Sequence, residues 1–317
     1  MVKVSVIMSV YNEKEFLLDS IRSILNQTFK DFEFIIIDDG SKPPILPLIE
    51  SFVDNRIKLI VNEENMGLTA SLNKGLFWAN GEYLARQDAD DISLPERLGA
   101  QVKYLKDHPE IAVVGTSYYV IDSKGKILEE RKPALNPMST LATGNRLTHG
   151  SVMFRRSIME DTDIGKYDEA HFRYAQDYEY WLRISKKYEI RNIEHPLYKL
   201  RVHVNTVGIE KSREQALYVI LAQRMAENME SCVLPSYKDL TKEERARFHN
   251  MVAYNHIQVG DIKTARKELY KSIEAQPTKE SVGSFLLSYL SKERVLSGQN
   301  LYRQLRFMLQ KHLRLSI

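Results

Sequence analysis

The stretch FEFIIIDDGS, Phe32–Ser41, decides the fold class, because a mostly apolar run ends abruptly in two carboxylates, a glycine and a serine. A continuous apolar run of this length is typical of a strand that is covered on both faces of a parallel sheet. Helical patterns at Glu13–Gln27 and Gly67–Gly81 alternate with such runs and predict an α/β fold, with a mostly parallel sheet and helices on both faces. The other strand-like runs are Val4–Val10, Ile57–Asn62, Glu82–Asp88 and Ile111–Ile121.

Polar side chains follow three of these runs. Tyr11 follows the first, Asp39 the second, and the triplet Asp88, Asp90 and Asp91 the fourth. Ligands of open α/β sheets bind beyond the carboxyl ends of the strands, so three polar strand ends indicate one binding site. Carboxylates this close repel each other, and a hard divalent cation such as Mg²⁺ or Mn²⁺ relieves that repulsion.

Ordinary turn chemistry is the alternative at each strand end. Asp39 and Gly40 are residues that turns prefer. Ser93 and Glu96 have the spacing of a capping box, which would start a helix directly after a solvated acidic turn.

A second, helical part follows the strands. We expect a boundary near residue 210, with an α/β domain over 1–210 and a helical domain over 211–317. Ala253, Gly260 and Ala265 have the spacing of one tetratricopeptide repeat, which predicts either a hairpin packed on the α/β domain or a protein-docking surface. Residues 294–317 carry leucines and basic residues but no acidic one, which fits a helix on an anionic membrane or a basic helix docked on the protein itself.

Composition narrows the functional classes. A net charge of +3 gives no signature of nucleic-acid binding. The N-terminal sequence lacks the features of a signal peptide, and Cys232 is the single cysteine, so we expect a cytoplasmic protein. If segment 294–317 binds anionic lipid, the protein is peripheral to the inner face of the membrane. No glycine-rich phosphate loop follows the first strand, which argues against dehydrogenases and nucleotidyltransferases.

The ordered blocks VSVIMSVYNE, DFEFIIIDDGS, LNKG and GEYLARQDADD resemble those of family 2 glycosyltransferases. The branch that builds bacterial exopolysaccharide, capsule and O-antigen repeat units is the most similar. The resemblance spans about Val4 to Val207. It implies a GT-A fold, dependence on a divalent cation and inversion at the anomeric carbon.

The same resemblance assigns roles to individual residues. Asp39 would read the edge of a uracil or thymine base, and Asp90 would be the direct metal ligand. Asp88 would contact the ribose or the metal. His203 in LYKLRVH would contact the metal or the diphosphate, and Arg201 nearby would pair with a phosphate group. The remaining residues of the nucleotide-sugar site would be Ser9, Tyr11, Asn65, Gly67 and Asp91.

The catalytic base is expected in AQDYEYWLRIS, Ala175–Ser185. Asp177 matches the base of the family's Glu-Asp motif, although Gln176 replaces the usual glutamate. A simple N-cap at Asp177 is the alternative, and Glu179 is the other candidate base.

These assignments predict an inverting transfer of a sugar from a nucleotide-diphospho-sugar, a UDP-sugar, to a hydroxyl of a growing, lipid-linked cell-surface glycan. The alternative is a non-catalytic nucleotide-sugar-binding or scaffold protein that acts through its helical domain.

Overall fold

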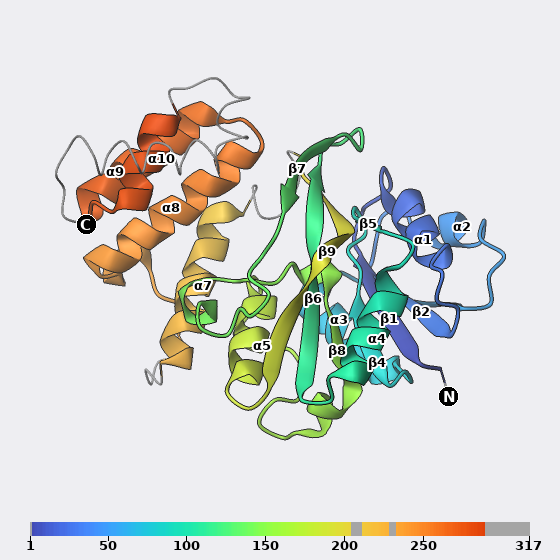
Figure 1. The fold of residues 1–317 in the computed structure, drawn as a ribbon. Helices are drawn as coiled ribbons and strands as arrows, with labels where there is room; N and C mark the ends of the chain where they lie inside the picture. Colours follow the sequence, from blue (N-terminus) through green and yellow to red (C-terminus); the bar gives the residue numbers. More distant parts are fainter. Residues whose placement is uncertain (1, 204–210, 228–232, 289–317) are drawn as a thin grey trace. The chain divides into compact units, whose positions relative to one another are not determined.

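The computed structural model describes residues 2–203, 211–227 and 233–288 (Figure 1). They belong to two compact units, one running from Met1 to Arg201 and including Met225–Met229, the other taking the rest of the chain from Val202. The basic segment 294–317 and the boundary expected near residue 210 lie outside the described residues, so both stay predictions.

The first unit is built on a mixed sheet, whose described strands follow the order β3-β2-β1-β4-β8-β6-β9-β5, with β7 paired to β6. β1 to β4 are parallel neighbours, while β8, β5 and β7 run antiparallel to their partners. The α/β class with a largely parallel sheet is confirmed. The strands are β1 Val4–Val10, β2 Phe32–Asp38, β3 Ile57–Val61, β4 Tyr83–Arg86, β5 Ile92–Ser93, β6 Ile111–Ile121, β7 Ile127–Arg131, β8 Met153–Arg155 and β9 Glu189–Arg201.

Helices cover both faces of this sheet (Figure 1). On one face, Leu17 and Leu98 join Met8 in a closed apolar cluster. On the other face α3 packs so closely that a Cβ at Gly75 would lie 2.6 Å from the side chain of Ile7. The helices are α1 Leu17–Leu25, α2 Leu46–Ile49, α3 Leu68–Trp78, α4 Arg97–Asp107 and α5 Gln176–Ser185, with short 3-10 turns η1 Leu141–Thr143, η2 His149–Ser151 and η3 Arg156–Glu160.

The capping box expected at Ser93 and Glu96 is wrong. α4 begins at Arg97, and its N-cap, Glu96, makes no capping hydrogen bond through its side chain. Ser93 lies in β5 instead, where its hydroxyl donates to Oε1 of Gln87 at 2.6 Å and accepts from Arg97 at 2.7 Å. The Ser93 hydroxyl therefore bonds to Gln87 and Arg97 and does not cap the helix.

The described part of the second unit is helical. Around Gly260, α8 and α9 form a helical hairpin, joined by a turn in which Gly260 has a φ of 77°. Ala253 and Ala265 are fully buried where the two helices meet. The elements are α7 Ser212–Ala226, η4 Tyr237–Asp239, α8 Lys242–Gln258, α9 Ile262–Ala275 and α10 Lys279–Leu287.

None of the helices in the described part of the chain has the length and apolar character needed to cross a membrane.

Candidate active site

The sheet brings the expected site residues to one edge. β3, β2, β1 and β4 lie side by side in parallel, so their carboxyl ends share that edge. The order reverses between β1 and β4, which makes this a switch point of the kind where α/β sheets bind ligands. Ser9 lies in the last part of β1 itself, and the expected residues that follow these strands are Tyr11, Asp39, Asn65, Gly67, Asp88, Asp90 and Asp91.

Asp39 organises the side of the edge formed by β2 and β3. Its carboxylate is 1% exposed and accepts hydrogen bonds from Nδ2 of Asn62 at 2.8 Å and from the amides of Met66 and Gly67 at 2.9 and 3.0 Å. Gly40, with a φ of +73°, allows the turn after β3 to approach, since a Cβ there would lie 2.5 Å from the backbone. Asp39 therefore shapes this part of the edge.

Tyr11, directly after β1, and Asn65, in the turn after β3, are both exposed to solvent. Tyr11 has 53% of its surface exposed. Gly67 has a φ of +90°, a conformation that side chains rarely adopt, and its amide is held by Asp39. The edge thus offers an accessible aromatic ring after β1 and, after β3, a backbone turn that Asp39 holds.

The acidic triplet lies at the end of β4 with unequal surroundings. Asp88 is half-buried, and its Oδ1 accepts a hydrogen bond from Nη2 of Arg86 at 2.6 Å. Asp91 is 1% exposed, and its Oδ1 accepts the amide of Arg201 at 2.7 Å. Burial and the neighbouring carboxylates raise the pKa of Asp88 and that of Asp91, although Arg86 opposes the shift at Asp88.

Two buried guanidinium groups lie behind these carboxylates. Arg86 is 2% exposed and Arg97 is fully buried. Arg97 donates to the carbonyl of Arg86 at 2.7 Å and to Oε1 of Gln101 at 3.1 Å. Burial lowers the pKa of Arg97 to about 10, so it stays charged at neutral pH. The chain therefore tolerates three adjacent aspartates partly because it buries two positive charges beside them.

The donor set suits a hard divalent cation. Asp88 and Asp90 offer carboxylate oxygens, and Oδ2 of Asp91 is buried without a hydrogen-bond partner among the described residues, although the Tyr198 hydroxyl lies near enough to lower its pKa. Within the described ranges, however, no three His, Cys, Asp or Glu side chains are already arranged as a metal site. His203 belongs to the second unit, so its part in such a site stays a prediction.

Arg201, expected to pair with phosphate, is 4% exposed. Its guanidinium donates to the carbonyl of Asp90 at 2.8 Å and to those of Asp122 and Ser123 at 3.1 Å. Together with the bond from its amide to Asp91, these contacts fix the end of β9 beside the acidic triplet.

Asp177 lies in the first turn of α5. The helix begins at Gln176 after Ala175, whose φ is 54°, so the N-cap interpretation of Asp177 is wrong. Burial raises the pKa of Asp177 to about 6; the negative charge of Asp88 adds to this rise, while the Tyr178 amide and the Asn145 side chain oppose it. A carboxylate with this pKa can both ionise and accept a proton near neutral pH.

Glu179, the other candidate base, is committed elsewhere. It is buried, and its carboxylate pairs with Arg183 through two contacts of 2.7 Å. The geometry therefore favours Asp177.

His149, in η2, is a neutral residue that packs against aromatic side chains. Its Nε2 lies 3.0 Å from the Tyr167 hydroxyl, and its ring packs edge-on against Trp181. Burial, aided by the charge of Arg86, holds the pKa of His149 well below its usual range.

Two residues at this site were not found from the sequence. A Cβ at Gly150 would lie 2.0 Å from the Tyr198 hydroxyl and 2.6 Å from Oδ2 of Asp88, so only glycine fits there. Asn145 donates from Nδ2 to Oδ2 of Asp177 at 2.7 Å. Both come from the segment between β7 and β8, and no local spacing links them to the aspartates.

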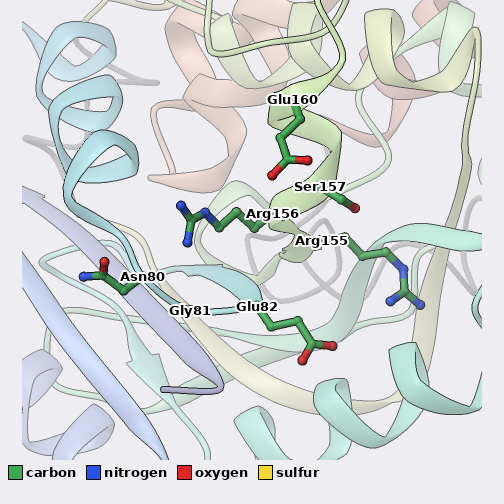
Figure 2. Close-up of a pocket in the computed structure, with 7 residues that line it drawn as sticks. All are labelled: Asn80, Gly81, Glu82, Arg155, Arg156, Ser157 and Glu160. Atoms are coloured by element: carbon green, nitrogen blue, oxygen red, sulfur yellow. The ribbon is translucent and has the colours of Figure 1, made fainter. Parts of the chain in front are cut away.

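A cavity of about 440 Å³ opens at the opposite edge of the sheet (Figure 2). It lies at the amino end of β4, where Tyr83 pairs with Arg155 of β8. None of the expected site residues lines it, so it is separate from the edge described above. Its lining consists of Asn80, Gly81, Glu82, Arg155, Arg156, Ser157 and Glu160.

A mixed sheet with helices on both faces and carboxylates at its switch point is the arrangement of GT-A structures. Comparison with solved structures agrees: the UDP-GlcNAc complex of residues 1–349 of S. aureus TarS has a TM-score of 0.55 at 18% identity, over 95% of this chain and 88% of that one. The chain spans 53% of a longer TarS structure.

The family is shown by sequence. The model of glycosyl transferase family 2 matches residues 5–162. An uncharacterised glycosyltransferase of Methanocaldococcus jannaschii is 39% identical over 68% of this chain and 76% of its own length. The amylovoran biosynthesis glycosyltransferase AmsE of Erwinia amylovora is 33% identical over 64% of this chain and 78% of its own length. The chain therefore belongs to glycosyltransferase family 2.

Proposed function

We propose that this glycosyltransferase moves a sugar from a UDP-sugar to a hydroxyl of a growing glycan, with inversion at the anomeric carbon. The observation that carries the proposal is that the segment between β7 and β8 meets two carboxylates from separate elements: Asn145 bonds to Asp177, and a Cβ at Gly150 would lie 2.6 Å from Oδ2 of Asp88. Asp88 follows β4 and Asp177 lies in α5, yet the charge of Asp88 contributes to the raised pKa of Asp177. A sugar donor held at Asp88 and an acceptor hydroxyl held at Asp177 would meet between these two carboxylates.

The donor nucleoside lies at the β1–β3 end of the edge in this proposal. Tyr11 stacks on the base, and Ser9, Asn65 and Gly67 border it. A carboxylate has about four acceptor positions, of which Asp39 uses three, so one remains for a base N–H. The TarS complex with UDP-GlcNAc supports a UDP-sugar as the donor class.

Asp90 and Asp88 would hold a Mn²⁺ or Mg²⁺ ion, with His203 as a further ligand and Asp91 supporting them. A cation bound there supplies Lewis-acid stabilisation of the departing diphosphate. Asp91 mainly supports Asp88 and Asp90, because its side chain is nearly inaccessible and is bonded to the amide of Arg201.

Asp177 is the general base. It takes the proton of the acceptor hydroxyl as that oxygen attacks the anomeric carbon, while the bond from this carbon to the diphosphate oxygen breaks. A single displacement of this kind inverts the configuration.

The name of AmsE supports polysaccharide biosynthesis as the setting. We infer a lipid-linked glycan acceptor and a cytoplasmic protein, peripheral to the inner face of the membrane, with segment 294–317 as the contact to anionic lipid. The α/β domain over 1–210 would carry catalysis, and the helical domain over 211–317 would position it.

The experiment is a donor screen. Purified protein is incubated with Mn²⁺, a lipid-linked oligosaccharide mixture and UDP-, dTDP- or GDP-sugars in turn, and release of the nucleoside diphosphate is measured. The proposal expects acceptor-dependent release from a UDP-sugar, lost in Asp177→Asn and kept in the exposed control Asp19→Asn. Turnover that persists in Asp177→Asn would refute the base assignment.

A further inference from the structure

The segment between β7 and β8 places an amide side chain directly on the expected base. Nδ2 of Asn145 donates to Oδ2 of Asp177 at 2.7 Å. Oδ1 of the same amide accepts the backbone N–H of Leu147 at 3.1 Å. The two contacts need opposite ends of the amide, so together they fix which end faces the carboxylate.

This segment is itself anchored to α5. The Tyr178 hydroxyl donates to the carbonyls of Leu141 and Ala142 at 2.8 and 3.1 Å. Tyr178 follows Asp177 in the helix and is 1% exposed. The base and the residue that bonds to it are therefore held in one arrangement from both sides.

We propose that Asn145 is the positioning residue of this enzyme: its amide fixes the orientation of the Asp177 carboxylate and stabilises its ionised form. The inference rests on the proposed function, in which Asp177 is the base. Asn145 need not touch either substrate, and it acts through the carboxylate that it orients.

The groups around Asp177 show what the hydrogen bond from Asn145 contributes. Burial and the charge of Asp88 favour the protonated carboxyl, which cannot act as a base. The amides of Asp177 and Tyr178 oppose them from the helix, and Tyr167, which is neutral, adds no positive charge. Asn145 adds a side-chain donor to the ionised form, and it comes from outside the helix.

The test follows the carboxyl of Asp177 without substrate. The full chain is labelled with ¹³C at aspartate carboxyls, the Asp177 signal is assigned with Asp177→Asn, and its pH titration is recorded by NMR. Wild type should titrate at about pH 6. Asn145→Ala should shift the midpoint upward by about one pH unit, because a hydrogen bond to a charged group is lost. Asn145→Asp, which keeps the shape but adds a like charge, should shift it further.

Thr143→Ala is the matched control from the same segment. Its hydroxyl bonds to the carbonyl of Thr140 at 2.8 Å and not to Asp177, so the midpoint should stay at the wild-type value. An unchanged midpoint in both Asn145 variants would overturn the proposal, as would an equal shift in Thr143→Ala.

Kinetics then separate this inference from the proposed function. With the UDP-sugar found in the donor screen, Asn145→Ala should lower kcat about fivefold at pH 6, with KM little changed, and the loss should shrink above pH 8 as Asp177 ionises fully. A shifted midpoint without any sugar transfer would sink the proposed function and keep the hydrogen-bond role. Transfer with an unshifted pH profile would sink the positioning role alone.

Discussion

Asp177→Asn should stabilise the protein at neutral pH while it removes activity. Folding raises the pKa of Asp177 from 3.8 to about 6, so the folded state holds a proton there more tightly than the unfolded chain does. The free energy of unfolding therefore decreases as pH rises from about 4 to about 6, and the cost of the ionised group is fully present above that window. An amide does not ionise and avoids this cost.

The size of the effect follows from the shift. About two pKa units correspond to roughly 3 kcal/mol, which is an upper value because Asp177 is only half-buried and solvent screens its charge. We expect Asp177→Asn to raise the free energy of unfolding by about 1–3 kcal/mol at pH 7.5. The gain should fall below about 1 kcal/mol at pH 4, where the wild-type carboxyl is protonated in the folded state.

Urea denaturation at both pH values measures this difference. Asp19→Asn is the control, since Asp19 is exposed on α1 and its side chain is 60% accessible. It should change stability little, and equally at both pH values. If Asp177→Asn destabilises the protein at pH 7.5, or if its gain is the same at pH 4, the raised pKa and the base assignment built on it are refuted.

Two further perturbations test the packing of each unit. Gly150→Ala should lower activity and destabilise the first unit by about 1–3 kcal/mol, because the added Cβ would lie 2.0 Å from the Tyr198 hydroxyl. In the double variant, Tyr198→Phe should partly restore thermal stability. If the losses of the two single variants simply add, this explanation is contradicted. In the second unit, burial would raise the pKa of Glu268, yet the hydrogen bond from His249 and the charge of Arg213 lower this pKa to about 2. The stabilisation that ionised Glu268 provides is complete above about pH 4.5 and is lost as pH falls toward 2. Glu268→Gln should therefore lower the free energy of unfolding by about 2–3 kcal/mol at pH 7 and by little at pH 2.5, as followed by circular dichroism. A loss of stability that does not change with pH would contradict this.

The strands were predictable where apolar runs are long. β1, β2 and β6 begin and end at the expected residues because each is buried along nearly its whole length. β5 and β8 have two and three residues, which is too short for any periodicity to show. β9 has 13 residues, but its exposed and buried positions are mixed, so it does not show as a long apolar run.

The site was predictable where neighbouring strands end together. Asp39 and Asp88 follow strands that flank β1, so parallel pairing alone brings them to one edge. Asn145 lies 32 residues from Asp177, and Gly150 meets Asp88 only through the tertiary fold. Such contacts depend on how a long connection returns to the sheet, which local sequence does not encode.

The central claim is that the aspartates after β4 hold a cation and a nucleoside diphosphate. Calorimetric titration of UDP, with and without Mn²⁺, into wild type and Asp90→Ala tests it most directly. We expect binding that requires Mn²⁺ in wild type and is lost in Asp90→Ala, while Asp19→Ala behaves as wild type. Binding of UDP that is equally strong without metal, or unchanged in Asp90→Ala, would contradict it.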